Sequence, residues 1–216
     1  MNRREALKKI GLSFGFAVSG TAAISLLQGC AETDVSTWEP LFFNEEEAYF
    51  VTKAVDIILP PTSGSPGASD VGVPQFIDQY LQEVVPLKEQ DLTKAYLSKI
   101  LDKLKQDTGK EELLDVTSQE IKPIIAASLA KTPEEEKKVI EQVNSYVKAI
   151  GNGGTSELHS DVASFALLNN LRGLAIWSYK TSQKVGEDIL AYDPNPGRQQ
   201  GCVSVQEATG GPAWSL

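Results

Sequence analysis

Few side chains in this 216-residue chain could carry out chemistry on their own. The one histidine, His159, cannot form a metal site or a catalytic triad without partners. Two acidic runs, Glu45–Glu47 and Glu134–Glu136, stand where helices are expected to begin, and acids in a first turn are stabilised by the helix dipole. No Gly-x-Gly-x-x-Gly, P-loop or Cys-x-x-Cys-His motif occurs. We therefore expect no catalytic, cofactor-binding or metal-binding residue in this chain.

Cys30 is the residue for which the sequence predicts a covalent modification. Residues 1–9 are basic, residues 10–27 form an apolar run with many small residues, and the motif LQGC ends at Cys30. This is the layout of a secretory signal. The motif resembles a bacterial lipobox, in which the cysteine receives lipid through a thioether and the chain is cut after Gly29. The alternative is a permanent membrane anchor, since the run is at the lower limit of length for a span.

Arg3 and Arg4 point to the export route. The segment NRREALK at residues 2–8 resembles the twin-arginine export motif. It departs from the usual pattern at Asn2, where Ser or Thr is common, and at Ala6, where Phe is common. Paired arginines also occur in the basic regions of ordinary Sec signals, so both routes remain open.

The charge of the chain excludes some partners. Removing residues 1–29 removes four basic groups and one acid, which changes the net charge from −9 to −12. An acidic protein does not bind nucleic acid through its phosphates, and anionic lipid headgroups repel it, so a membrane attachment must be covalent. The acidity either keeps the protein soluble or attracts a basic partner. After lipidation of Cys30 only Cys202 remains, either as a buried bystander or as a residue that bonds a partner.

The expected organisation is a signal peptide over 1–29, a lipid-anchored tether over 30–43 and a single domain over 44–216. Periodicity and caps predict an all-α helical bundle with long Pro/Gly-rich loops and an irregular C-terminal tail over 191–216. The expected helices cover about 44–59, 74–84, 88–108, 118–129, 133–150, 161–180 and 181–190.

Three details of this pattern can be tested against a structure. In the second helix a buried stripe is expected from Phe76, Ile77, Tyr80, Leu81 and Val84. Pro123 is expected in the first turn of the fourth helix, where proline is tolerated. The helix over 161–180 is apolar on one broad side, which is typical of the central helix of a bundle.

The segment ILPPTSGSPGASDVGVPQFIDQYL over 58–81 resembles the signature of the gluconate 2-dehydrogenase subunit 3 family. In that family a helix ends in Leu-Pro, a loop carries Pro-Gly-Ala, and a second helix opens with an apolar-Phe-Ile-Asp run. The late residues Tyr192, Gly201-Cys202 and Trp214 are similar to the family's closing pattern. The middle of the chain, about 88–158, is the least distinctive part.

The resemblance implies a non-catalytic small subunit of a cell-envelope dehydrogenase that oxidises sugars or polyols. It implies a large partner subunit that is an FAD-containing flavoprotein of the glucose–methanol–choline (GMC) type, and a c-type cytochrome, carrying haem c, as electron acceptor. No cofactor is expected in this chain itself. The small subunit is expected to support folding, twin-arginine export and membrane association of the flavoprotein. The alternatives are a free-standing periplasmic or outer-membrane lipoprotein that acts as a binding module, and an enzyme in its own right.

The two Pro/Gly-rich segments and the late aromatic residues are the candidate contacts with a partner. Loops of this composition lose little freedom on binding, and Trp and Tyr are enriched at interfaces. The other interpretation is that these aromatic side chains pack within the bundle. The candidate residues are Pro66, Gly67, Trp177, Tyr192, Pro196, Gly197, Cys202 and Trp214.

Overall fold

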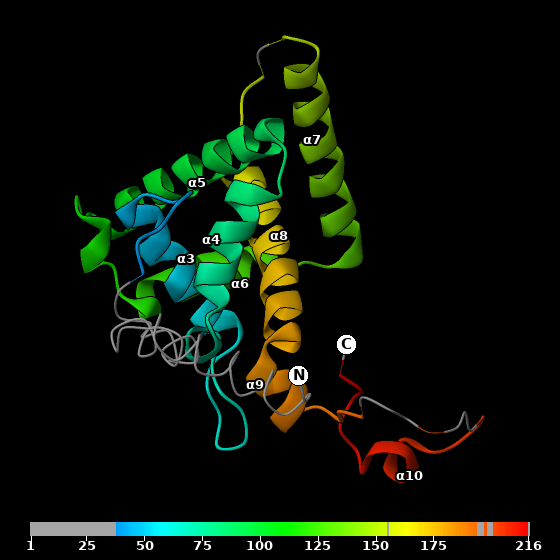
Figure 1. Ribbon diagram of the computed structural model, residues 1–216. Coiled ribbons are helices and arrows are strands. Elements are labelled where there is room, and N and C mark those ends of the chain that lie inside the picture. Colours follow the sequence, from blue (N-terminus) through cyan, green and yellow to red (C-terminus); the bar gives the residue numbers. More distant parts are fainter. Residues whose placement is uncertain (1–37, 155, 194–196, 198–200, 216) are drawn as a thin grey trace, which may run out of the picture. The chain divides into compact units, whose positions relative to one another are not determined.

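The computed structural model describes residues 38–154, 156–193, 197 and 201–215 (Figure 1). The fold is carried by the compact unit Glu39–Leu216. The predicted signal peptide and most of the predicted tether lie outside the described residues, and so do Arg3, Arg4, Gly29 and Cys30.

The described part of the chain is all-α, as the sequence predicts. The helices, labelled as in Figure 1, are α3 (Glu45–Ile58), α4 (Val73–Glu83), α5 (Leu87–Thr108), α6 (Ser118–Leu129), α7 (Pro133–Gly151), α8 (Ser160–Thr181), α9 (Gln183–Asp188) and α10 (Val205–Thr209). Two short 3₁₀ turns, η3 (Ser69–Val71) and η4 (Leu113–Asp115), lie between them. None of the helices in this part is both long and apolar enough to cross a membrane.

Local capping explains where the helices begin. The side chain of Asn44 accepts a hydrogen bond from the Glu47 N–H, and Glu47 reaches back to the Asn44 N–H, which is a capping box. Thr132 and Glu135 form the same box at α7, with Pro133 in the first turn. The helix α5 ends at Gly109, whose positive φ of 68° suits glycine.

The helix α8 lies at the centre of the bundle, which confirms its prediction as the central helix. It packs against α3, α4, α5, α6, α7 and α9. Its buried side chains include Phe165, Leu168 and Leu171. Figure 1 shows α8, in yellow and orange, with α4 and α7 running beside it. The core therefore forms around α8, and α4 is one of the helices that cover it.

Three details differ from the expectations. The α4 stripe is narrower than predicted, because Ile77 and Leu81 are buried while Val84, just past the end of the helix, is 61% exposed. Phe76 and Tyr80 are half-buried.

Pro123 lies in the second turn of α6 and not in the first. Proline has no N–H, so one carbonyl of the preceding turn has no helical hydrogen bond. Pro123 is exposed, so this carbonyl lies on the side of the helix that faces solvent. The tail is also not wholly irregular, since Ser204 and Glu207 form a capping box that opens the short helix α10.

Candidate partner-binding surface

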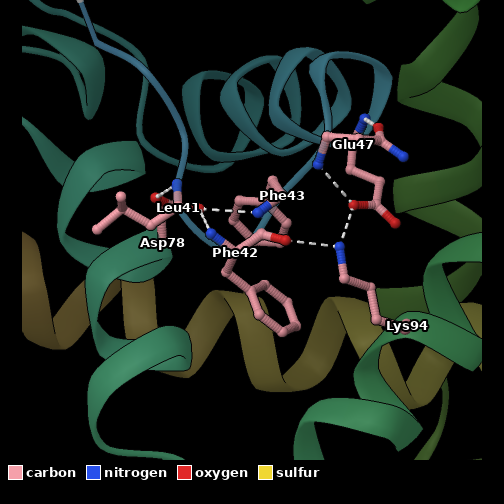
Figure 2. Close-up of polar contacts among 7 residues, drawn as sticks. Leu41, Phe42, Phe43, Glu47, Asp78 and Lys94 are labelled. Atoms are coloured by element: carbon pink, nitrogen blue, oxygen red, sulfur yellow. Dashed lines mark hydrogen bonds and ion pairs between the residues drawn. The ribbon is translucent and has the colours of Figure 1, made fainter.

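Asp78 on α4 is fully buried, and its carboxylate fixes the backbone that leads into the domain. The Leu41 N–H donates to Oδ2 at 2.7 Å, and the Phe42 and Phe43 N–H groups donate to Oδ1 at 3.0 and 2.9 Å. Figure 2 shows this segment wrapped around the carboxylate. A buried carboxylate needs such hydrogen bonds, because an unpaired charge is costly away from water. The position of Asp78 is therefore structural.

Lys94 on α5 holds the same segment from the other side. Its ammonium group donates to the Glu47 carboxylate and, at 2.7 Å, to the Phe42 carbonyl (Figure 2). It also lies 4.4 Å from the centre of the Phe42 ring, a cation–π distance. We call Leu41–Phe43 together with Asp78, Glu47 and Lys94 the tether clasp. The charged side chains of the clasp form hydrogen bonds and an ion pair with its backbone and with one another. The clasp therefore holds the end of the predicted tether on α4 and α5.

The first Pro/Gly-rich segment is folded against the bundle. The Tyr179 hydroxyl on α8 donates to the Pro66 carbonyl at 2.7 Å. Gly67 is buried, and a Cβ atom there would lie 2.8 Å from the Cδ atom of Pro61. Pro66 is half-buried, while residues 60–64 are exposed. A partner that contacts this loop therefore meets residues 60–64 more readily than Gly67.

Three aromatic rings form a cluster on the surface beside this loop. Trp177 on α8 meets Phe76 and Tyr80 on α4 edge to face, with ring centres 5.1 and 5.5 Å apart, and Phe76 stacks on Tyr80 at 6.0 Å. Trp177 remains 43% exposed. Trp177 thus packs in part within the bundle and also presents apolar surface to solvent, and that it contacts a partner stays a prediction. We call Phe76, Tyr80 and Trp177 the aromatic cluster.

The aromatic cluster continues into an apolar groove. The groove has a volume of about 510 Å³ and lies between α4, α5, α7 and α8. Tyr80 belongs to both features. The lining residues are Tyr80, Leu81, Val85, Glu89, Leu92, Thr93, Tyr96, Ile140, Val143, Val147, Phe165, Ala166, Asn169, Asn170 and Leu174. Burial, and secondarily the neighbouring Tyr146, raises the pKa of Tyr96, so this phenol stays neutral at physiological pH.

A second hollow, of about 470 Å³, lies along another side of α7 and differs in character. Charged and polar side chains line most of it, including Lys138, Glu141 and Ser145. His159 also lines it and is exposed. Within the part of the chain that the structure describes, no cluster of three or more His, Cys, Asp or Glu side chains could hold a metal ion.

The late part of the chain returns to the segment that follows α9. The Ala191 N–H donates to the Ala213 carbonyl at 2.8 Å, and the Ser215 N–H donates to the Ala191 carbonyl at 2.9 Å. This pairing brings the stretches that carry Tyr192 and Trp214 together, and these side chains are 54% and 49% exposed. They therefore offer aromatic surface at the end of the domain.

The other late candidates sit in the loop between Tyr192 and α10. Cys202 is a free, exposed thiol with a φ of 53°, so the alternative of a buried bystander is wrong. Gly197 is exposed with a φ of 57°, and Pro196 lies outside the described residues. That any of these residues contacts a partner stays a prediction.

Sequence reasoning missed most of the groove. It placed Tyr80 in the core and gave the apolar side chains of α7 no role. A signal was present, because Ile140, Val143, Val147 and Ile150 are spaced by three and four residues, the pattern by which helices pack on one another.

The fold and this surface define an all-helical protein with exposed aromatic and apolar surface suited to binding another protein. A family model described as gluconate 2-dehydrogenase subunit 3 matches residues 45–197. The chain belongs to this family, whose name makes it a subunit of a dehydrogenase complex, and the resemblance seen in residues 58–81 is confirmed. Searches of the curated proteins and of the solved structures found no match.

Proposed function

We propose that this chain is the non-catalytic small subunit of a cell-envelope dehydrogenase that oxidises a sugar or polyol. Its large subunit is an FAD-dependent flavoprotein of the GMC type, and a c-type cytochrome takes the electrons. The family match over residues 45–197 is the observation that carries this proposal. The matched stretch includes the aromatic cluster and the residues lining the apolar groove, which is where a partner would bind.

The proposed work of the chain is to support folding, export and membrane association of the flavoprotein. The twin-arginine signal at Arg3 and Arg4 carries the loaded flavoprotein across the membrane in a folded state, and lipid on Cys30 holds the complex on the periplasm-facing surface. From Cys30 to Leu41 the chain spans at most ~40 Å when fully extended. The tether clasp then fixes its far end on α4 and α5, which keeps the domain and its partner close to the membrane.

Isolation of the native protein from detergent-solubilised membranes tests this proposal. The expected result is a yellow complex with flavin absorption that contains a GMC-type flavoprotein and oxidises a sugar or polyol. A variant whose lipobox is replaced by an ordinary signal-cleavage site without cysteine, so that the signal is still removed but no lipid is attached, should move the complex from the membrane to the soluble fraction with the flavoprotein still bound. A colourless protein without a flavoprotein partner, isolated at low salt, would exclude the subunit role and favour the free-standing lipoprotein.

A further inference from the structure

One side of α7 carries an apolar seam that the bundle covers only in part. The seam consists of Ile140, Val143, Val147 and Ile150, which are spaced by three and four residues. Ile140, Val147 and Ile150 are 42%, 38% and 40% exposed, and α7 has no buried residue. In helical assemblies a seam with this spacing packs against another helix. The helix α7 packs on α8, and Ile140, Val143 and Val147 of the seam line the groove.

The walls that α4, α5 and α8 give the groove carry apolar side chains beside the polar Thr93, Asn169 and Asn170, and the groove has room for further side chains. Leu81, Leu92, Phe165 and Leu174 lie opposite the seam on α4, α5 and α8. A cavity of roughly 150 Å³ accepts a benzene ring, so the groove of about 510 Å³ has space for about three side chains of that size. A helix that presents residues at i, i+3 or i+4, and i+7 supplies three such side chains along one face.

The charge of the groove indicates what kind of helix it accepts. Glu89 is the one charged side chain among the described residues that line it. This carboxylate is exposed and forms none of the salt bridges found in the described part of the chain. A complementary helix therefore carries a Lys or Arg beside its apolar seam. A second copy of this chain is a poor occupant, because two chains that each carry a net charge of −12 after removal of residues 1–29 repel one another.

We propose that an amphipathic α-helix of the flavoprotein docks in this groove. Its aliphatic side chains pack between the α7 seam and the wall formed by Phe165 and Leu174, and a basic side chain faces Glu89. The inference rests on the proposed function, because it assigns the helix to the flavoprotein. It goes further by naming the binding site, the secondary structure of the bound segment and its charge.

Copurification of the flavoprotein with variants of α7 tests the proposal. The double variant Val143→Asp/Val147→Asp places two carboxylates in the seam, and Gln142→Asp/Ser145→Asp places two on the polar side of the same helix, along the other hollow. We expect the seam variant to retain at least tenfold less flavoprotein and the control variant to retain the wild-type amount. Circular dichroism and thermal melting of both variants check that the domain still folds.

Two further measurements do not depend on the stability of the double variant. Glu89→Lys should weaken binding of the flavoprotein, and raising the salt concentration should recover part of the loss, because salt screens the repulsion between two cations. A photoreactive p-benzoylphenylalanine at position 147 should crosslink to a helix of the flavoprotein that carries an apolar seam and a Lys or Arg.

The outcomes separate this inference from the proposed function. If the wild-type chain brings down the flavoprotein and the folded seam variant does so equally well, the groove is not the docking site and the subunit role stands. A crosslink from position 147 to a second copy of the chain would also overturn the inference. If the wild-type chain brings down no flavoprotein, the proposed function fails first, and the assignment of the helix fails with it.

Discussion

Replacing Asp78 tests the idea that one buried carboxylate fixes the end of the tether. Asp78→Ala removes three hydrogen bonds to a charged acceptor, from the N–H groups of Leu41, Phe42 and Phe43. The Phe43 N–H is buried, so leaving it without a partner costs about 1–3 kcal/mol. The other two N–H groups are partly buried and recover some hydration, so each costs about 0.5–1.5 kcal/mol. Together these contributions amount to about 2–6 kcal/mol, and we expect a loss of stability near the middle of this range, about 3–4 kcal/mol.

Asp78→Asn keeps the size of the side chain and removes its negative charge, so it separates the two contributions. The amide keeps one carbonyl oxygen, which can still accept from Phe42 and Phe43, but its NH₂ group faces the Leu41 N–H, which is also a donor. We expect this variant to lose about 2 kcal/mol, roughly half of the loss in Asp78→Ala.

Urea unfolding of the chain without its signal, followed by circular dichroism, measures both losses. For a domain of this size about 3–4 kcal/mol corresponds to a decrease of about 10 °C in Tm. Hydrogen exchange should show faster exchange of the Leu41, Phe42 and Phe43 amides in both variants. Glu83→Ala, on the same helix but exposed, is the control and should change stability by less than about 0.5 kcal/mol. A loss below about 1 kcal/mol in Asp78→Ala, with unchanged exchange, would refute the structural role of the clasp.

Three further predictions concern the loop before α4 and the start of α6. Gly67→Ala should destabilise the fold by about 1–3 kcal/mol, because its Cβ would lie 2.8 Å from a proline ring atom. The control Gly64→Ala, whose Cβ would have nothing within 4 Å, should be nearly neutral. Equal losses of the two variants in urea unfolding would contradict this prediction. Tyr179→Phe removes the hydroxyl that holds the loop and should cost about 1 kcal/mol, and an unchanged urea midpoint would argue against that contact. Hydrogen bonds, first from Lys110, lower the pKa of Glu120 to about 2, so the stability it contributes is complete above pH 4.5 and is lost as the pH falls toward about 2. NMR titration of Lys110→Met should show a higher pKa for Glu120, and an unchanged pKa would assign the shift to other groups.

Helix boundaries could be predicted where all their determinants lie within a few consecutive residues. The start of α7 is an example, because Thr132, Pro133 and Glu135 supply the cap, the first helical residue and the return hydrogen bond. The start of α10 was missed although Ser204 and Glu207 show the same spacing. The helix has only five residues, which is too short for an apolar periodicity that would predict it.

The tether clasp could not be predicted, because its partners are far apart in the sequence. The donors to Asp78 come from residues 35 to 37 positions earlier, and Lys94 reaches a carbonyl 52 positions away. No local pattern encodes such pairings. Burial on α4 was overestimated for the same reason, since an apolar stripe does not show how far the neighbouring helices extend. Among the rings of the described residues, Phe76 and Tyr80 contact only one another and Trp177.

The placement of these features on α4 would couple the proposed lipid attachment of the chain to the proposed binding of the flavoprotein. Within two turns of this helix, Asp78 holds the tether clasp, Phe76 and Tyr80 belong to the aromatic cluster, and Leu81 lines the groove. Asp78 and Leu81 are buried against the bundle, so these groups do not move independently of one another. A partner docked in the groove is therefore held at a fixed position relative to the end of the tether. Lengthening residues 31–37 would change the distance from a lipid anchor without changing the docking site, whereas breaking the clasp at Asp78 would release the two from each other.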